Sequence, residues 1–470
     1  MSDRENYPEK MLRDPDKVVD AFAEGGISRR EFGIRMSALG FSALTISKLF
    51  FEVGPAAAAA NSSLQGTVRM YKGPFITNEV QWMDAMIKGF NKLYPKIKVV
   101  IDEFNFTTVQ AQATASFASS AHDIVYLPEN IFAAFAPKGG PLLDLTTYIN
   151  SPSFAATRKV IPPSLWASAK PHGAPLSAVP YVTQPNSMYF VNLDLMKKYG
   201  ISASNSPGGV GVKGGWRTTY ESIRAAAKKM TQDGNYGLAI RTNGLANFGW
   251  FDWYGYIRRA GGDILTKDWT KSDLDNPSVA AAIQMLSDII NKDKSMPPYG
   301  EYTWPALRDL FSGGRVGITH DEAGLNQVLT QNKAAFTWDV AQFPAPYGMW
   351  KNQWSLSISG MFTIDKTTKV PDQAWAVIEY WSSLPVVKAY FEAISFCAVR
   401  TDASTQMWKH NPVMRTVQND FVPLEHGPLL HPKINQFVSI IQPLVDDCYQ
   451  GNMTGAQAMH EAATQINALL

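Results

Sequence analysis

Short apolar runs alternate with longer amphipathic stretches along most of the chain, starting at Gln65. Short runs of apolar and β-branched residues bounded by turn-forming residues predict strands. On this basis we expect strands over residues 67–71, 97–101, 123–127, 189–191, 237–240, 316–319 and 362–364.

Longer segments carry their apolar residues at the spacing of an α-helix, and several begin at Pro, Asp, Ser or Thr, which are common helix starts. The pattern predicts helices over residues 80–93, 219–229, 277–291, 372–382 and 454–470. Strands that alternate with helices favour an α/β fold with largely parallel sheets. A chain of 470 residues exceeds one ordinary core, so we expect two lobes.

The N-terminal 60 residues have the layout of an export signal. Polar residues 1–27 precede Ser28-Arg29-Arg30-Glu31-Phe32, a mostly apolar stretch over 33–53, and alanines at 56–60. This order is typical of a secretory signal peptide, and the paired arginines resemble a twin-arginine signal. A membrane-spanning helix needs ~20 mostly apolar residues, and Arg35 and Lys48 interrupt this stretch. We therefore expect export by the twin-arginine translocase, cleavage near residues 58–61, and a periplasmic mature protein.

Charge and cysteine content exclude some classes of protein. The formal net charge is only +2, whereas nucleic-acid binding requires a concentrated basic surface. The two cysteines, Cys397 and Cys448, provide neither a disulfide framework nor metal-ligand spacing, so we expect free thiols.

We find no catalytic or cofactor signature. The sequence lacks GxSxG, Walker, GxGxxG and HExxH motifs, and its seven histidines are scattered. We therefore expect no enzymatic activity, no cofactor and no metal. A secreted polysaccharide-acting enzyme remains the alternative, because a catalytic carboxylate pair is defined by its separation in space.

Several motifs in order resemble one family. The segment FNKLYPKIKV (90–99) is followed by VPY (179–181), YFVNLDL (189–195), AKKMT (227–231) and FSGGRVGI (311–318), and GNMT (451–454) precedes the last helix. Over nearly the whole chain after residue 65, this order resembles extracellular solute-binding family 1, the maltose-binding-protein type. Val191 is a departure, since the family often has tyrosine there.

The resemblance implies a two-lobed periplasmic binding protein fold (type II-like), with a ligand cleft between lobes that hinge segments connect. The first lobe would comprise residues 61–183 and 356–402, and the second residues 186–350 and 404–470. The chain would cross between lobes near residues 183–185, 350–354 and 400–402.

The resemblance also implies a function. The protein would be a monomeric component of an ABC importer that binds a small polar solute, a sugar or oligosaccharide, by hinge closure and delivers it to permease subunits in the inner membrane. Polyol- or polyamine-type ligands, and a chemosensory role, remain alternatives.

Binding residues in α/β lobes come from loops at the carboxyl ends of strands. Sugars need carboxylates and amides for their hydroxyl groups, and aromatic rings for their apolar faces. The residues expected to bind ligand are Lys72, Tyr126, Glu129, Asn130, Tyr181, Asn186, Trp250, Trp253, Asp321, Glu322 and Trp354. For Trp250 and Trp253, burial in the core of the second lobe is the alternative.

Overall fold

The computed structural model describes residues 63–73, 79–104, 108–171, 173–203, 218–242, 250–346, 348–349, 355–356, 359–394, 396–403, 407–408 and 411–470. The predicted export signal (1–60), the crossing predicted at 350–354 and its Trp354 lie outside the described residues.

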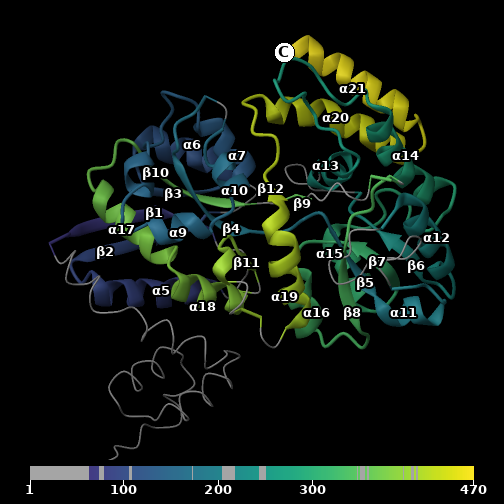
Figure 1. The fold of residues 1–470 in the computed structure, drawn as a ribbon, viewed down its shortest axis with the longest axis horizontal. Coiled ribbons are helices and arrows are strands. Elements are labelled where there is room, and N and C mark those ends of the chain that lie inside the picture. The colour runs from purple at the N-terminus through teal and green to yellow at the C-terminus, as the bar shows by residue number, and fades with distance from the viewer. Residues whose placement is uncertain are drawn as a thin grey trace, which may run out of the picture.

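Two α/β lobes lie side by side, the first at the left of Figure 1 and the second at the right. The first is built on a six-stranded sheet of order β11-β4-β10-β3-β1-β2. Its strands are β1 (Gly66–Tyr71), β2 (Ile97–Asp102), β3 (Ile124–Pro128), β4 (Ala178–Thr183), β10 (Gly360–Ile364) and β11 (Cys397–Ala398). Every residue of β3, β4 and β10 is buried, as expected of central strands covered on both faces.

The second lobe has a four-stranded sheet of order β6-β7-β5-β8. Its strands are β5 (Met188–Asn192), β6 (Tyr236–Ala239), β7 (Val316–His320) and β8 (Trp338–Gln342). The seven strands predicted from the apolar runs are confirmed, whereas β4 and β8 were not predicted. Both sheets are mixed and not largely parallel, because β10 returns antiparallel to β3 and β5 runs antiparallel to β7 and β8.

Helices cover the sheets, and the five predicted helices are present. The longer helices are α5 (Glu79–Leu93), α6 (Val109–Ser119), α12 (Tyr220–Met230), α13 (Trp250–Arg259), α14 (Pro277–Asn291), α15 (Trp304–Ser312), α17 (Pro371–Trp381), α18 (Leu384–Ile394), α20 (Ile434–Tyr449) and α21 (Gly455–Leu469). The shorter ones are α7 (Glu129–Phe135), α8 (Thr146–Ile149), α9 (Ala155–Val160), α10 (Pro163–Ser168), α11 (Leu193–Lys198), α16 (Leu325–Gln331) and α19 (Pro412–Thr416).

The chain passes between the sheets at three places. The first passage is the short connection between the end of β4 at Thr183 and the start of β5 at Met188. The second runs from β8 to β10 and includes β9 (Ser355–Leu356). The third follows β11, and its β12 (Glu425–His426) pairs in parallel with β9. The second and third passages are therefore joined by backbone pairing.

The third passage is largely helical. It includes α19 and a π-helical turn, η3 (Val417–Phe421), and these lie between the lobes in Figure 1. The helix α19 contacts β8 of the second sheet, while η3 contacts β11 of the first. The Gln418 side chain holds this contact, since it donates to the Ala398 carbonyl and accepts from the Ala398 amide at 3.0 Å each.

Both cysteines are buried free thiols, as expected: Cys397 is in β11 and Cys448 in α20. Among the described residues, no helix combines the length and apolar character that crossing a membrane would require.

Close packing of α12 on β6 depends on Gly237. A Cβ at this position would overlap the carbonyl oxygen of Ala227 in α12. Since the obstacle is backbone, we expect Gly237→Ala to lower the free energy of unfolding by about 1–3 kcal/mol, the usual cost of overpacking. Urea denaturation measures this loss, with Gly324→Ala as a control because the nearest atom to a Cβ there lies at 3.6 Å. Equal stability of the two variants would contradict the prediction.

Candidate functional site

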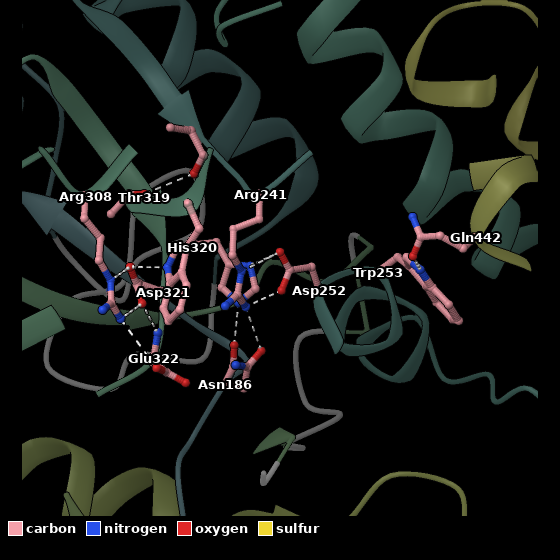
Figure 2. A network of polar contacts seen from close by, with 12 residues as sticks. Asn186, Arg241, Asp252, Trp253, Arg308, Thr319, His320, Asp321, Glu322 and Gln442 are labelled. Atoms are coloured by element: carbon pink, nitrogen blue, oxygen red, sulfur yellow. Dashed lines mark hydrogen bonds and ion pairs between the residues drawn. The ribbon is translucent and has the colours of Figure 1, made fainter. Parts of the chain in front are cut away.

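A connected group of polar side chains lies at the carboxyl-end edge of the second lobe's sheet, where β6 and β7 end (Figure 2). The loop after β6 provides Arg241, the end of β7 provides His320, and Asp321 and Glu322 follow directly. Asn186, from the first passage between lobes, reaches the same group. This is the position at which α/β folds commonly bind ligands.

Arg241 and Asp252 form a buried ion pair at the centre of this group. The Arg241 Nε atom donates to Asp252 Oδ2 at 2.8 Å, and the Arg241 terminal nitrogen donates to Oδ1. His320 Nδ1 lies 3.3 Å from Asp252 Oδ2, and His320 Nε2 is 2.6 Å from the Asn186 carbonyl oxygen. Burial alone would raise the pKa of Asp252, but the charges of Arg241 and His320 outweigh it and lower the pKa below its usual value.

A second ion pair joins α15 to the end of β7. Arg308 donates to both Asp321 oxygens, from Nε at 2.8 Å and from Nη2 at 2.6 Å. Trp304, one turn earlier on the same helix, donates its indole N–H to Asp321 Oδ2 at 3.1 Å. The guanidinium groups of Arg308 and Arg241 lie 3.9 and 5.4 Å from the centre of the Trp304 ring. Trp304 therefore connects the two ion pairs.

Asp321 and Glu322 differ in how much acceptor capacity they retain. The Asp321 oxygens accept from Arg308, from the Trp304 indole and from the Glu322 amide, and the side chain is 2% exposed. Glu322 is 20% exposed, and its contact with Arg308 is longer, at 3.5 Å. Burial raises the pKa of Glu322, although the charge of Arg308 opposes this. Asp321 therefore positions its neighbours, whereas Glu322 can accept hydrogen bonds from a bound molecule.

Three of the residues predicted in the first lobe, the buried Lys72 and two tyrosines, lie close together. Lys72 donates to Glu79 at 2.5 Å and to the Tyr390 hydroxyl at 3.2 Å. Its ammonium group lies 5.4 Å from the centre of the Tyr126 ring, and Tyr181 packs 5.9 Å from the Tyr390 ring. Burial lowers the pKa of Lys72, and the Glu79 charge opposes this. Lys72, Tyr126 and Tyr181 thus form part of one buried polar and aromatic group beneath the end of β1.

Other polar residues collect where the lobes are joined. Glu129 and Asn130 start α7 directly after β3 and are 1% and 5% exposed. Among the described residues, no hydrogen-bond partner is found for Asn130 Oδ1, Gln184 Oε1, Asn186 Nδ2 or either polar atom of the Gln342 side chain. Buried polar atoms are normally hydrogen-bonded. These amides therefore retain donors and acceptors with which a polar molecule could bond.

Of the two tryptophans predicted to bind ligand, Trp253 lies apart from this polar group in Figure 2. Trp250 and Trp253 are 2% and 1% exposed within the apolar core of the second lobe. The Trp253 indole donates to Gln442 on α20 at 2.9 Å. The Trp253 indole therefore holds α13 against α20, and the burial of both indoles corresponds to the core alternative considered from the sequence.

The site also contains Arg241, Asp252, Trp304 and Arg308, and Glu425 lies where the lobes are joined, bonded to Thr183. None of these five was among the residues predicted from the sequence. Arg241 directly follows a predicted strand, and Trp304 and Arg308 are four residues apart and share one helix face. These three residues could therefore have been predicted from the sequence. No sequence signal distinguishes Asp252, within an aromatic run, or Glu425. No group of metal-ligating side chains that could hold an ion is found within the described residues.

Solved structures of similar fold are ABC transporter solute-binding proteins. An ABC substrate-binding protein of Listeria monocytogenes, solved with cycloalternan, is 18% identical with a TM-score of 0.70, covering 86% of this chain and 99% of that one. MalE3 of T. maritima, bound to maltose, is 20% identical with a TM-score of 0.70, covering 86% and 100%. A Thermotoga lettingae protein bound to α-D-tagatose has the same TM-score at 19% identity, covering 86% and 100%. The fold is therefore the two-lobed fold of these binding proteins, as predicted.

Sequence comparison agrees with the fold. A binding protein of Brucella abortus (strain 2308) is 20% identical over 421 residues, which are 88% of this chain and 95% of the relative. The family model described as bacterial extracellular solute-binding protein matches residues 76–386. The chain therefore belongs to the bacterial extracellular solute-binding protein family.

Proposed function

We propose that this protein is the solute-binding subunit of an ABC importer, and that it binds a neutral, polyhydroxylated solute such as a sugar or oligosaccharide. The observation that best supports a neutral solute is the charge balance at the carboxyl-end edge of the second lobe's sheet. Arg241 and Arg308 are each committed to a buried carboxylate, Asp252 and Asp321. No arginine of this group is left for a phosphate, whereas Glu322 and the unpartnered amides suit hydroxyl groups.

The relatives support a carbohydrate. The similar solved structures hold cycloalternan, maltose and tagatose, all of which are neutral and rich in hydroxyl groups. At 18–20% identity these proteins share the fold with this chain, so the carbohydrate class of its solute is our inference.

The proposed binding residues differ in the role we propose for them. Asn130, Asn186 and Glu322 would contact the solute, with Trp354 stacking on it, and Glu129 would act from the enclosed junction of the lobes. Lys72, Tyr126, Tyr181 and Asp321 would support these contacts from the surrounding packing. Trp250 and Trp253 would act through the core of the second lobe.

Closure of the lobes would trap the solute. We propose lobes of residues 61–183 with 356–402 and of 186–350 with 404–470. The membership of the strands in two separate sheets supports this division. The mature protein would work as a monomer in the periplasm, after twin-arginine export and cleavage near residues 58–61. It would pass the solute to permease subunits in the inner membrane and leave it chemically unchanged.

A thermal-shift screen of the chain from Asn61 onward, against sugars, polyols, amino acids and polyamines, tests this proposal. A solute that binds only the folded protein stabilises it by about 2.7 kcal/mol at a hundredfold excess over Kd. We expect a clear rise in melting temperature with one neutral carbohydrate and no product by mass spectrometry. A shift with amines alone would favour a polyamine-type ligand, and consumption of the carbohydrate would favour an enzyme; either result contradicts the proposal.

A further inference from the structure

Two buried glutamates lie where the three passages between the lobes meet. Glu129 begins α7 in the first lobe, and Glu425 forms β12 in the third passage. They are 1% and 0% exposed. Neither forms an ion pair with a lysine or arginine of the described residues. Buried carboxylates usually have such a partner, because an isolated charge is costly to remove from water.

Glu129 is bonded to the second passage and packed against the third. Its Oε2 accepts from the Ser359 amide at 3.2 Å, and its own amide donates to the Ser359 carbonyl at 2.9 Å. A Cβ at Gly427 would overlap Glu129 Oε1 and approach the Ser168 hydroxyl on α10. The carboxyl group is therefore enclosed by α10 and by two of the passages.

Glu425 connects the third passage to the other two. Thr183, at the start of the first passage, donates its hydroxyl to Glu425 Oε2. Glu425 pairs in register with Ser355 of the second passage. Within the described part of the chain, neither Glu425 Oε1 nor the Ser355 hydroxyl has a hydrogen-bond partner.

Where the structure describes them, the elements packed around this pair provide no compensating cation. They contribute hydroxyl groups and one thiol: Ser168 on α10, Thr183 on β4, Ser355 on β9, Ser359 before β10 and Cys397 on β11. Lys170, just after α10, is exposed. The charge of Arg258 acts on His426 and, together with burial, lowers the pKa of that histidine. The negative charge of Glu129 repels that of Glu425 and raises its pKa.

Protonation of Glu129 and Glu425 removes both the cost of burying their charges and the repulsion between them. Burial raises the pKa of Glu129 to about 7, although hydrogen bonds from Ser168 and Ser359 oppose this. Burial raises the pKa of Glu425 well above its usual value, and the Glu129 charge raises it further against the Thr183 hydrogen bond. The same Glu425 charge contributes to the raised pKa of the Cys397 thiol.

We propose that Glu129 and Glu425 form a proton-binding site that couples closure of the two lobes to proton uptake. The passages that enclose the pair are the segments whose backbone must turn when the lobes separate. Opening would loosen the contacts to Ser359, Gly427 and Thr183 and let water reach the carboxyl groups, which can then ionise. The proposal extends the hinge closure in our proposed function and concerns the protein without solute.

The sign of the effect follows from linkage. The closed form has the raised pKa and binds more protons than the open form, so closure is favoured at low pH and loses free energy as pH rises. For Glu129 the loss runs from about pH 4.5, the ordinary value, to about pH 7. Within this window the closed-to-open ratio changes by up to about tenfold per pH unit for each proton taken up.

Small-angle X-ray scattering of the solute-free protein between pH 5 and 8.5 tests the proposal. We expect the radius of gyration to increase with pH in the wild-type protein. The double variant E129Q/E425Q, neutral at every pH, is expected to stay compact throughout. The matched control Glu221→Gln changes an exposed carboxylate on α12 and should expand as the wild type does. A constant wild-type radius, or equal expansion of the double variant, would overturn the proposal.

If the double variant does not fold, a further variant tests the link between closure and proton uptake. Thr183→Val removes the hydroxyl hydrogen bond that opposes protonation of Glu425. We expect this variant to have a larger radius of gyration than the wild type at the upper end of the pH range, because its ionised closed form has lost a stabilising hydrogen bond; a radius equal to or smaller than that of the wild type there would count against the proposal. Because no solute is present, a negative result here leaves the proposed solute binding standing.

Discussion

Replacement of Arg241 by methionine is expected to lower the free energy of unfolding by about 3–5 kcal/mol, the cost of leaving one member of a buried ion pair unpaired. Arg241 and Asp252 are each 5% exposed, so water cannot replace the lost partner. His320 and the Asn186 amide would lose their orientation as well. Urea denaturation at pH 7 measures the effect.

Arg224→Met is the matched control for this variant. Like Arg241, Arg224 forms ion pairs with carboxylates, in its case those of Asp288 and Asp293. Its side chain is 31% exposed, so its removal should lower the free energy of unfolding by at most about 1 kcal/mol. Adding Asp252→Asn to Arg241→Met should recover part of the stability, because it removes the unpaired charge. Equal losses for Arg241→Met and Arg224→Met would show that the Arg241 pair is not effectively desolvated.

Replacement of Glu322 by glutamine is expected to weaken solute binding about 10- to 100-fold. A charged acceptor contributes about 1.5–3 kcal/mol to a hydrogen bond, and each 1.4 kcal/mol is tenfold in affinity. Glu322 is the carboxylate of this edge with unused acceptor capacity, and its loss should leave Asp321 bonded to Arg308 and Trp304. Titration calorimetry with the solute that gives the largest thermal shift measures the change. The experiment belongs at pH 8, because burial raises the pKa of Glu322.

Asp309→Asn provides the control for Glu322→Gln. Asp309 is an exposed carboxylate on α15, the helix that carries Arg308. We expect its substitution to change neither affinity nor stability measurably. If Glu322→Gln binds the solute as tightly as Asp309→Asn does, Glu322 does not contact the solute.

Much of the fold was predictable from local patterns. Pro277 after Asn276 and the pair Thr454 and Gln457 mark helix starts that the structure shows as an N-cap and a capping box. The strands β4 and β8 were not predicted. Pro180 interrupts the strand signal in β4, where the ladder to β10 is irregular beside Gly360. Short fully buried strands also lack the alternation that identifies a half-buried strand.

The candidate site was predictable only in part. Strand ends indicated Glu129, Asn130, Asp321 and Glu322, because ligand loops follow strands in α/β folds. The aromatic run containing Trp250 and Trp253 was predicted to stack on a ligand, with a core position as the alternative, since apolar periodicity does not state what covers a helix face. Packing of α13 against α20 placed both indoles in the core.

The sequence by itself determined the α/β class, seven of the strands, five of the longer helices and the family, because these depend on local periodicity, capping residues and ordered motifs. Only the tertiary structure decided which charges meet. Arg241 and Asp252 are 11 residues apart, and they meet because the loop after β6 lies against α13. Thr183 and Glu425 are 242 residues apart, and they meet because the first and third passages converge. Burial then gives similar glutamates different properties: Glu322 keeps a cationic neighbour, whereas Glu129 and Glu425 have none among the described residues.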